Sequence, residues 1–163
     1  MTADLAATFL DRLDRVAARL RSLSRLDPPS GLTEPDQPSG ERWEWGQVWA
    51  HTAEFPRYWI DQVQAVLAAA PPEPPPFGRT KSDPARIEAI ERDRAAGAEG
   101  LMERLEPDLE DLRTLLLGMT GEDWRRRVRH QTLGVMDMTH VVEDFLVGHL
   151  EAHAAQLEGL LTA

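Results

Sequence analysis

Two histidines four residues apart, His149 and His153, are spaced in a way that suits metal binding. On an α-helix, residues four apart lie one above the other on the same face, so both imidazoles can reach one point. A helix commonly offers two ligands to a metal ion in this way. Helical phase also places Leu157 and Leu160 beside the pair, so we expect the pair to face the apolar side of its helix.

An inward-facing pair of histidines needs polar partners, and His51 is the candidate. It shares a helical face with Val48 and Phe55, so it also leans toward a core. His51 lies about 12 Å from the start of its helix, and the His149/His153 midpoint about 15 Å from the end of theirs. Antiparallel helices would therefore bring the three rings to one level, whereas parallel helices would separate them by about 9 Å.

Three neutral imidazoles leave a divalent metal with open positions for water or substrate, which is typical of catalytic zinc sites. Imidazole suits zinc, nickel, copper and iron, so the ligand type alone does not choose among them. The alternative interpretation is that these histidines are incidental residues of the core.

Composition excludes several other classes of function. The chain has 163 residues, a formal net charge of −10 and no cysteine. The acidity argues against nucleic acid as a partner, because phosphate binding requires a basic surface. No apolar run approaches the ~20 residues of a membrane helix, and the N-terminus does not resemble a signal peptide. Without cysteine, disulfides and a cysteine nucleophile are excluded. We expect a cytoplasmic protein that does not bind membranes.

Helical periodicity predicts an all-α protein, because strand patterns are scarce. The expected helices cover residues 4–26, 43–69, 84–119 and 137–161. Ser82 and Asp83 suit the N-terminal cap of the third helix, and Pro84 suits its first position. Pro107 lies inside that helix, so we expect a kink there or two abutting helices.

The predicted helices are long and amphipathic, which favours a four-helix bundle in one domain covering residues 1–163. The connections at 27–42 and 70–83 are long and rich in proline. In polyproline geometry, ~14 residues reach about 43 Å, enough to run the length of a ~39 Å helix. The second connection could therefore leave helices two and three parallel; a flexible surface loop is the alternative.

Two stretches resemble the DinB/YfiT-like superfamily: WEWGQVWAHTAEFPRYW, and VRHQTLGVMDMTHVVEDFLVGHLEAHAAQLEGLL. The family pattern has a His early in helix two, often followed by an acidic residue. A His-x-x-Phe/Leu-Gly segment and a His-x-x-x-His-x-x-Gln set follow later. The superfamily includes the mycothiol-dependent maleylpyruvate isomerase N-terminal domain, in which a glutamate occupies the position of His149. The present sequence is therefore more similar to the three-histidine branches.

The resemblance implies a four-helix bundle with up-down-down-up topology and long crossover loops. It also implies a divalent metal, zinc or nickel, held by His51, His149 and His153. The function it suggests is a metal-dependent transferase that joins a low-molecular-weight thiol, such as mycothiol or bacillithiol, to an electrophile. The alternatives are a non-catalytic metal-binding or stress-associated protein and a metal-dependent hydrolase. Family members often pair along their helices, so a homodimer is also compatible.

Other residues could support such a site, although none is assigned a catalytic role. Glu54, one turn after His51, could hold that ring or act as a base; a solvated surface residue is the alternative. Gln156 lies one turn past His153 and has the better helical phase for holding a ligand. Tyr58 could direct its hydroxyl toward the site or pack in the core.

Overall fold

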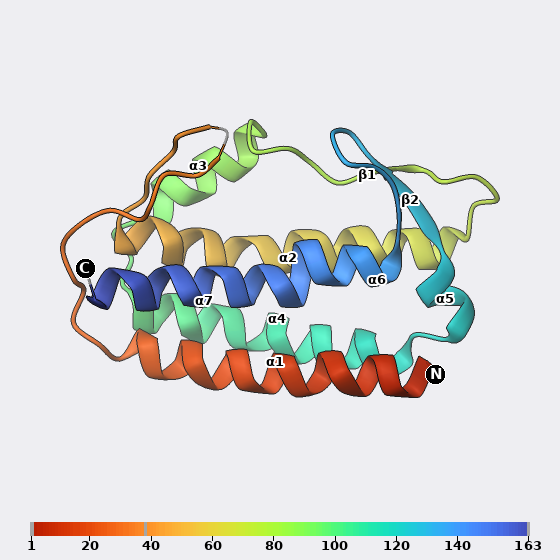
Figure 1. Cartoon of the computed structure of the whole chain (residues 1–163), viewed down its shortest axis with the longest axis horizontal. Helices are drawn as coiled ribbons and strands as arrows, with labels where there is room; N and C mark the ends of the chain where they lie inside the picture. Colours follow the sequence, from red (N-terminus) through yellow and green to blue (C-terminus); the bar gives the residue numbers. More distant parts are fainter. Residues whose placement is uncertain (1, 38, 163) are drawn as a thin grey trace.

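The computed structural model describes residues 2–37 and 39–162, and long helices packed side by side dominate it (Figure 1). These are α1 (Thr2–Ser24), α2 (Trp45–Ala69), α4 (Ala98–Gly118), and a last helix made of α6 (Met138–Val141), η1 (Val142–Leu146) and α7 (Val147–Thr162). Both α1 and α2 contact α4 and α7. Helices α1 and α7 run in one direction and α2 and α4 in the other, which confirms the up-down-down-up topology.

Each long helix buries an apolar stripe in a shared core. On α1 the stripe includes Phe9, Leu13 and Leu20, all at most 3% exposed. Residues three and four apart share a face of a helix, which is why this spacing is buried along its whole length. The start of α2 is held by a capping box, in which Glu44 and Gln47 bond each other's backbone N–H groups. The observed bounds of α1 and α2 lie within two residues of those predicted.

The predicted third helix is wrong in one respect: it is two helices, and the break is not at Pro107. Helix α3 (Pro84–Asp93) ends before Gly97, whose φ of 92° is not helical, and α4 begins at Ala98. Glycine tolerates this φ because it has no Cβ. Pro107 lies inside α4 without ending it. The predicted cap is confirmed, because the Asp83 side chain accepts a hydrogen bond from the Arg86 backbone N–H.

A small sheet also departs from the prediction of an entirely helical chain. Strands β1 (Pro76–Phe77), β2 (Arg127–His130) and β3 (Gly134–Asp137) pair in the order β1-β2-β3. The first pairing is parallel and the second antiparallel. A short helix, α5 (Gly121–Arg125), precedes β2. The strands were missed because arginines occupy the exposed positions of β2, which leaves too few apolar residues to show an alternating pattern.

The proline-rich segment after α2 returns over the bundle toward α3, and β1 forms part of it (Figure 1). This return places the start of α4 near the start of α2, so the two helices are parallel, as the length of the connection suggested. Within the described residues, no helix is both long and apolar enough to cross a membrane.

Candidate metal centre

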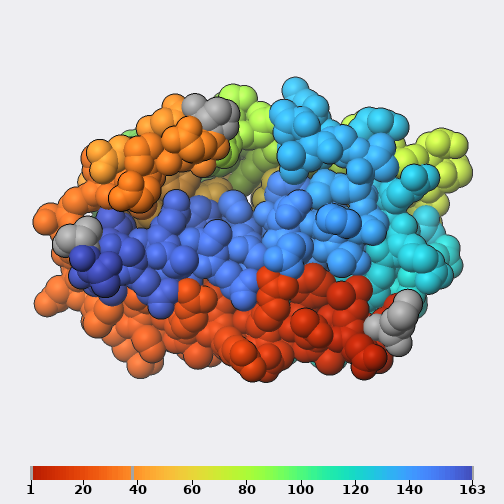
Figure 2. Space-filling view, viewed as in Figure 1, coloured from red at the N-terminus to blue at the C-terminus, as the bar shows by residue number. Residues whose placement is uncertain are grey.

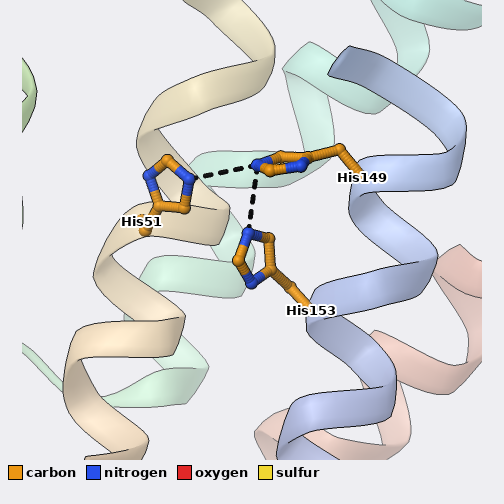
Figure 3. Close-up of side chains that lie close together, drawn as sticks. All are labelled: His51, His149 and His153. Atoms are coloured by element: carbon orange, nitrogen blue, oxygen red, sulfur yellow. Dashed lines mark hydrogen bonds between the residues drawn. The ribbon is translucent and has the colours of Figure 1, made fainter. Parts of the chain in front are cut away.

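The three predicted histidines meet between α2 and α7 (Figure 3). The Nε2 atom of His149 lies 3.2 Å from Nε2 of His51 and 3.1 Å from Nε2 of His153. The candidate ligand atoms of all three residues lie within 4.8 Å of one another. The two helices are antiparallel and bring the three rings to one level, as the positions of the histidines along their helices predicted.

Two hydrogen bonds determine which nitrogen of each ring faces this meeting point. His51 Nδ1 lies 2.9 Å from Glu54 Oε2, and His153 Nδ1 lies 2.7 Å from Gln156 Oε1. Both oxygens are acceptors, so both Nδ1 atoms donate. The Nε2 atoms of His51 and His153 in their neutral form therefore carry lone pairs, which is the state that binds a metal.

The cluster consequently has more acceptors than donors. His149 Nε2 carries at most one hydrogen, whereas two lone pairs face it. One of the two short contacts is therefore left without a well-directed hydrogen bond unless a cation lies among the nitrogens. Two nitrogens bound tetrahedrally to zinc at about 2.0–2.1 Å would be about 3.3 Å apart, close to the observed spacing. The donor set therefore fits a divalent metal.

Burial keeps these imidazoles neutral. It lowers the pKa of His51 and His149 well below the usual value, and neighbouring histidines lower both further. Burial also lowers the pKa of His153 to about 4, although the bond to Gln156 opposes the change. A buried imidazolium would lose its hydration, and the positive charge of Arg86 adds to the cost, which explains the direction.

Aromatic rings enclose part of the cluster. The Phe55 ring centroid lies 4.4 Å from that of His149, and the Trp43 centroid lies 5.3 Å from that of His51. His51 and His153 are buried, whereas His149 is only half-buried. Figure 2 shows the surface hollowed between the segment near residues 34–42 and the β2–β3 hairpin, with parts of α2 and α3 visible inside. Of the three histidines, His149 is the least buried.

Glu54 is committed to positioning and is not a free base. One oxygen accepts from His51, and the other forms an ion pair with Arg79. Burial raises the pKa of Glu54, and the charge of Arg79 opposes that rise. Tyr58 is half-buried, and its ring centroid lies 4.1 Å from the Arg79 guanidinium carbon. Among the described residues, no hydrogen bond joins the Tyr58 hydroxyl to a histidine.

The sequence reasoning missed three residues beside the cluster: Trp43, Arg79 and Arg86. Arg79 lies in the connection that was interpreted only as a linker, and Arg86 lies on the short helix α3. Their arrival at the site depends on the return of that connection over α2, which no local pattern showed. The N-terminal cap at Asp83, which the structure shows half-buried, was the local indication that a helix begins in this segment.

The fold and the cluster together define a four-helix bundle of up-down-down-up topology with a three-histidine candidate metal centre. The structure is similar to that of YfiT from Bacillus subtilis, described as a probable metal-dependent hydrolase with an unusual four-helix bundle topology. The TM-score is 0.74 at 19% identity, covering 96% of this chain and 86% of that one. An uncharacterized protein from Clostridium difficile 630 matches with a TM-score of 0.65 at 7% identity, covering 96% and 95%.

At these identities the similarity shows the fold, and it confirms the fold that the resemblance implied. No protein-family model and no curated protein matches the sequence. The chemistry must therefore be argued from the cluster itself.

Proposed function

We propose that this protein binds a divalent metal, zinc or nickel, through His51, His149 and His153 and acts as a metal-dependent transferase of a low-molecular-weight thiol. The observation that carries the proposal is the convergence of two Nε2 lone pairs, on His51 and His153, at the half-buried His149. A bound divalent metal lowers the pKa of a thiol or water so that its deprotonated form exists near neutral pH.

The surrounding residues would hold the ligands and exclude water. Glu54 and Gln156 orient two rings through their Nδ1–H groups. Such partners fix the tautomer and increase the basicity of the ligand nitrogen. Trp43 and Phe55 cover the cluster, while the side of His149 remains accessible to a small molecule.

The contacts of Glu54 favour a thiol as the nucleophile. The chain has no cysteine, so any such thiolate would come from a cofactor such as mycothiol or bacillithiol. Both oxygens of Glu54 are occupied, so this carboxylate is not free to take a proton from water. A thiol that coordinates a metal is deprotonated outright and needs no such base.

A metal-dependent hydrolase is the second candidate. It is favoured by the similarity to YfiT, which carries that description. In that case the nucleophile is water, and the open side at His149 admits an ester or amide in place of a thiol and an electrophile.

Metal analysis of single variants tests the ligand assignment. We expect purified protein to bind a stoichiometric amount of zinc or nickel, and His51→Ala, His149→Ala and His153→Ala each to lose most of it. His140→Ala is the matched control, because His140 is exposed on the same long helix and bonds Asp137 instead. Stoichiometric metal in all three cluster variants would show that the assignment is wrong.

Turnover assays separate the reactions. The zinc- and nickel-loaded proteins are incubated with mycothiol, bacillithiol or glutathione and 1-chloro-2,4-dinitrobenzene, and separately with p-nitrophenyl acetate. We expect a thiol-dependent rate above that of chelator-treated protein. A rate with the ester alone would support the hydrolase, and metal binding without either rate would indicate a non-catalytic binding protein.

A further inference from the structure

Arg86 lies beside the histidine cluster and is almost buried. Its residue exposure is 7%, and its guanidinium carbon lies 5.4 Å from the Trp43 ring centroid. The Trp43 ring in turn packs against His51 and His153, with centroid distances of 5.3 and 6.2 Å. Trp43 thus contacts both the guanidinium and the cluster.

The two neighbouring cations Arg79 and Lys81 are paired with carboxylates, and Arg86 is not. Arg79 pairs with Glu54 and Asp83, and Lys81 pairs with Asp36. Within residues 2–37 and 39–162, the structure gives Arg86 no carboxylate partner. Its recorded hydrogen bond runs from Nη1 to the Lys81 carbonyl oxygen, at 2.9 Å.

The carboxylates that act most strongly on the charge of Arg86 already have other hydrogen-bond partners. Glu41, Glu54 and Asp36 all raise the pKa of Arg86, but burial has the larger effect and lowers it. Glu41 accepts a hydrogen bond from the Trp43 indole at 2.7 Å. Glu54 bonds His51 and Arg79, and Asp36 bonds Lys81. A buried guanidinium without an anion is costly, so the environment favours an anion from outside.

One edge of the Arg86 guanidinium remains free for that anion. Nε and Nη2 have no hydrogen-bond partner among the described residues. Neither is one of the fully buried polar atoms that lack a partner, so both remain in contact with solvent. These two N–H groups point in parallel and match the two oxygens of a carboxylate. Among the described residues, the same edge already holds a carboxylate in five other arginines: Arg12, Arg21, Arg57, Arg92 and Arg94.

We propose that the Nε–Nη2 edge of Arg86 binds the carboxylate of a small ligand whose other end reaches the histidine cluster. The substrate class is thus a carboxylate-bearing molecule, either the electrophile or the thiol. This inference rests on the proposed function, because the metal would hold the reacting end. Arg86 contributes affinity and orientation at the non-reacting end.

A metal-free test measures carboxylate binding by itself. Chelator-treated protein is heated with 3-mercaptopropionate or its neutral amide, at constant ionic strength. We expect the carboxylate to raise the melting temperature of the wild type and of Arg25→Gln, but not of Arg86→Gln. Arg25 is exposed at the end of α1, so its replacement makes the same change in net charge. Equal shifts in Arg86→Gln and the wild type would overturn the proposal.

Inorganic phosphate at the same concentration distinguishes oxyanion classes. We expect a smaller shift than with the carboxylate, and a larger one would overturn the carboxylate assignment. Circular dichroism checks that Arg86→Gln is folded. Arg86→Met, which removes the buried charge and keeps an unbranched side chain, makes the same comparison if the glutamine variant does not fold.

A second titration uses zinc-loaded protein with 3-mercaptopropionate and 3-mercapto-1-propanol, followed by calorimetry. Charged hydrogen bonds contribute enough that we expect the wild type to prefer the carboxylate by about tenfold or more. This preference should fall to near parity in Arg86→Gln and persist in Arg25→Gln. If metal binds without a preference, the inference fails and the proposed function stands. If no metal binds, the proposed function fails, and the metal-free test still decides the role of Arg86.

Discussion

At the scale of single residues, the candidate centre depends on two side chains that never touch the meeting point of the nitrogens. Glu54 and Gln156 each accept a hydrogen bond from the Nδ1 of a histidine three residues away on the same helix. Because the acceptors are on the same helix as their histidines, each ring is oriented locally. The helix packing then only has to bring two oriented groups together.

Removing one of these acceptors should weaken metal binding without abolishing it. We expect Gln156→Ala to lower zinc affinity by about 10- to 100-fold, because His153 loses the partner that fixes its tautomer. Competition with a chromogenic chelator measures this. Gln64→Ala, an exposed site on α2, should keep the wild-type affinity. Equal affinities in the two variants would mean that the Gln156 bond does not position the ring.

At the scale of elements, the placement of α3 depends on a close approach to the first turn of α2. A Cβ at Gly46 would lie 2.0 Å from the Arg94 carbonyl oxygen, where the chain leaves α3. Only a glycine allows the two backbones to come this near. Helix α3 contains Arg86, and Asp83 is its N-terminal cap, so this contact also helps to place the charged residues beside the cluster.

Gly46→Ala should therefore destabilise the protein, by about 1–3 kcal/mol, because a backbone atom must move to admit the methyl group. Gly100→Ala is the matched control: its Cβ would meet nothing within 4 Å, and Gly100 is helical and exposed. Alanine there should be neutral or stabilise by up to about 1 kcal/mol. Urea unfolding of both variants gives the comparison, and a Gly46→Ala protein as stable as the wild type would contradict it.

A second local feature lies in the last helix, where the η1 segment inserts a π turn before α7. A Cβ at Gly148 would lie 2.1 Å from the Glu143 carbonyl oxygen, so the glycine accommodates the wider turn. The π turn changes the helical phase between Phe145 and His149. The spacing of His149 and His153 is unaffected, because both lie within the regular helix α7.

At the scale of the whole molecule, the cluster links stability to pH. In the folded state the pKa values of His51, His149 and His153 all lie below the value of about 6.5 expected in the unfolded chain. Below that pH the unfolded chain binds protons that the folded protein does not bind. Stability therefore decreases as the pH falls from about 6.5 toward the pKa values of the folded state. For His153 that pKa is about 4.

We expect the free energy of unfolding of chelator-treated protein to fall between pH 7 and pH 5, above the range where most carboxylates titrate. The raised pKa values of Glu54 and His140 oppose this trend, but they are two groups against three. His153→Gln should reduce the slope, and His140→Gln should not, because His140 is exposed and its pKa is raised by Asp137. A stability that is constant or increases toward pH 5 would contradict the neutral, buried state of the cluster.

Much of this architecture could be predicted from local sequence patterns. The apolar stripes located the long helices, and the heights of His51, His149 and His153 indicated an antiparallel pairing of their helices. The break at Gly97 was missed because the apolar positions of α3 and α4 continue across it, so the periodicity resembled one helix. The β2–β3 hairpin was missed because β2 has only four residues, and arginines occupy its exposed positions, Arg127 and Arg129. The alternation of apolar and polar residues is too short there to indicate a strand.

By itself, the sequence determined which residues share a helical face, because periodicity and the spacing of neighbours on a helix are local properties. It thereby specified the pairing of His149 with His153, their apolar side, and the cap at Asp83. Only the tertiary structure decided that Arg79 engages Glu54 and that Arg86 lies against Trp43 without an anion. Those contacts depend on how a proline-rich connection crosses the bundle, and they join residues that are distant along the chain.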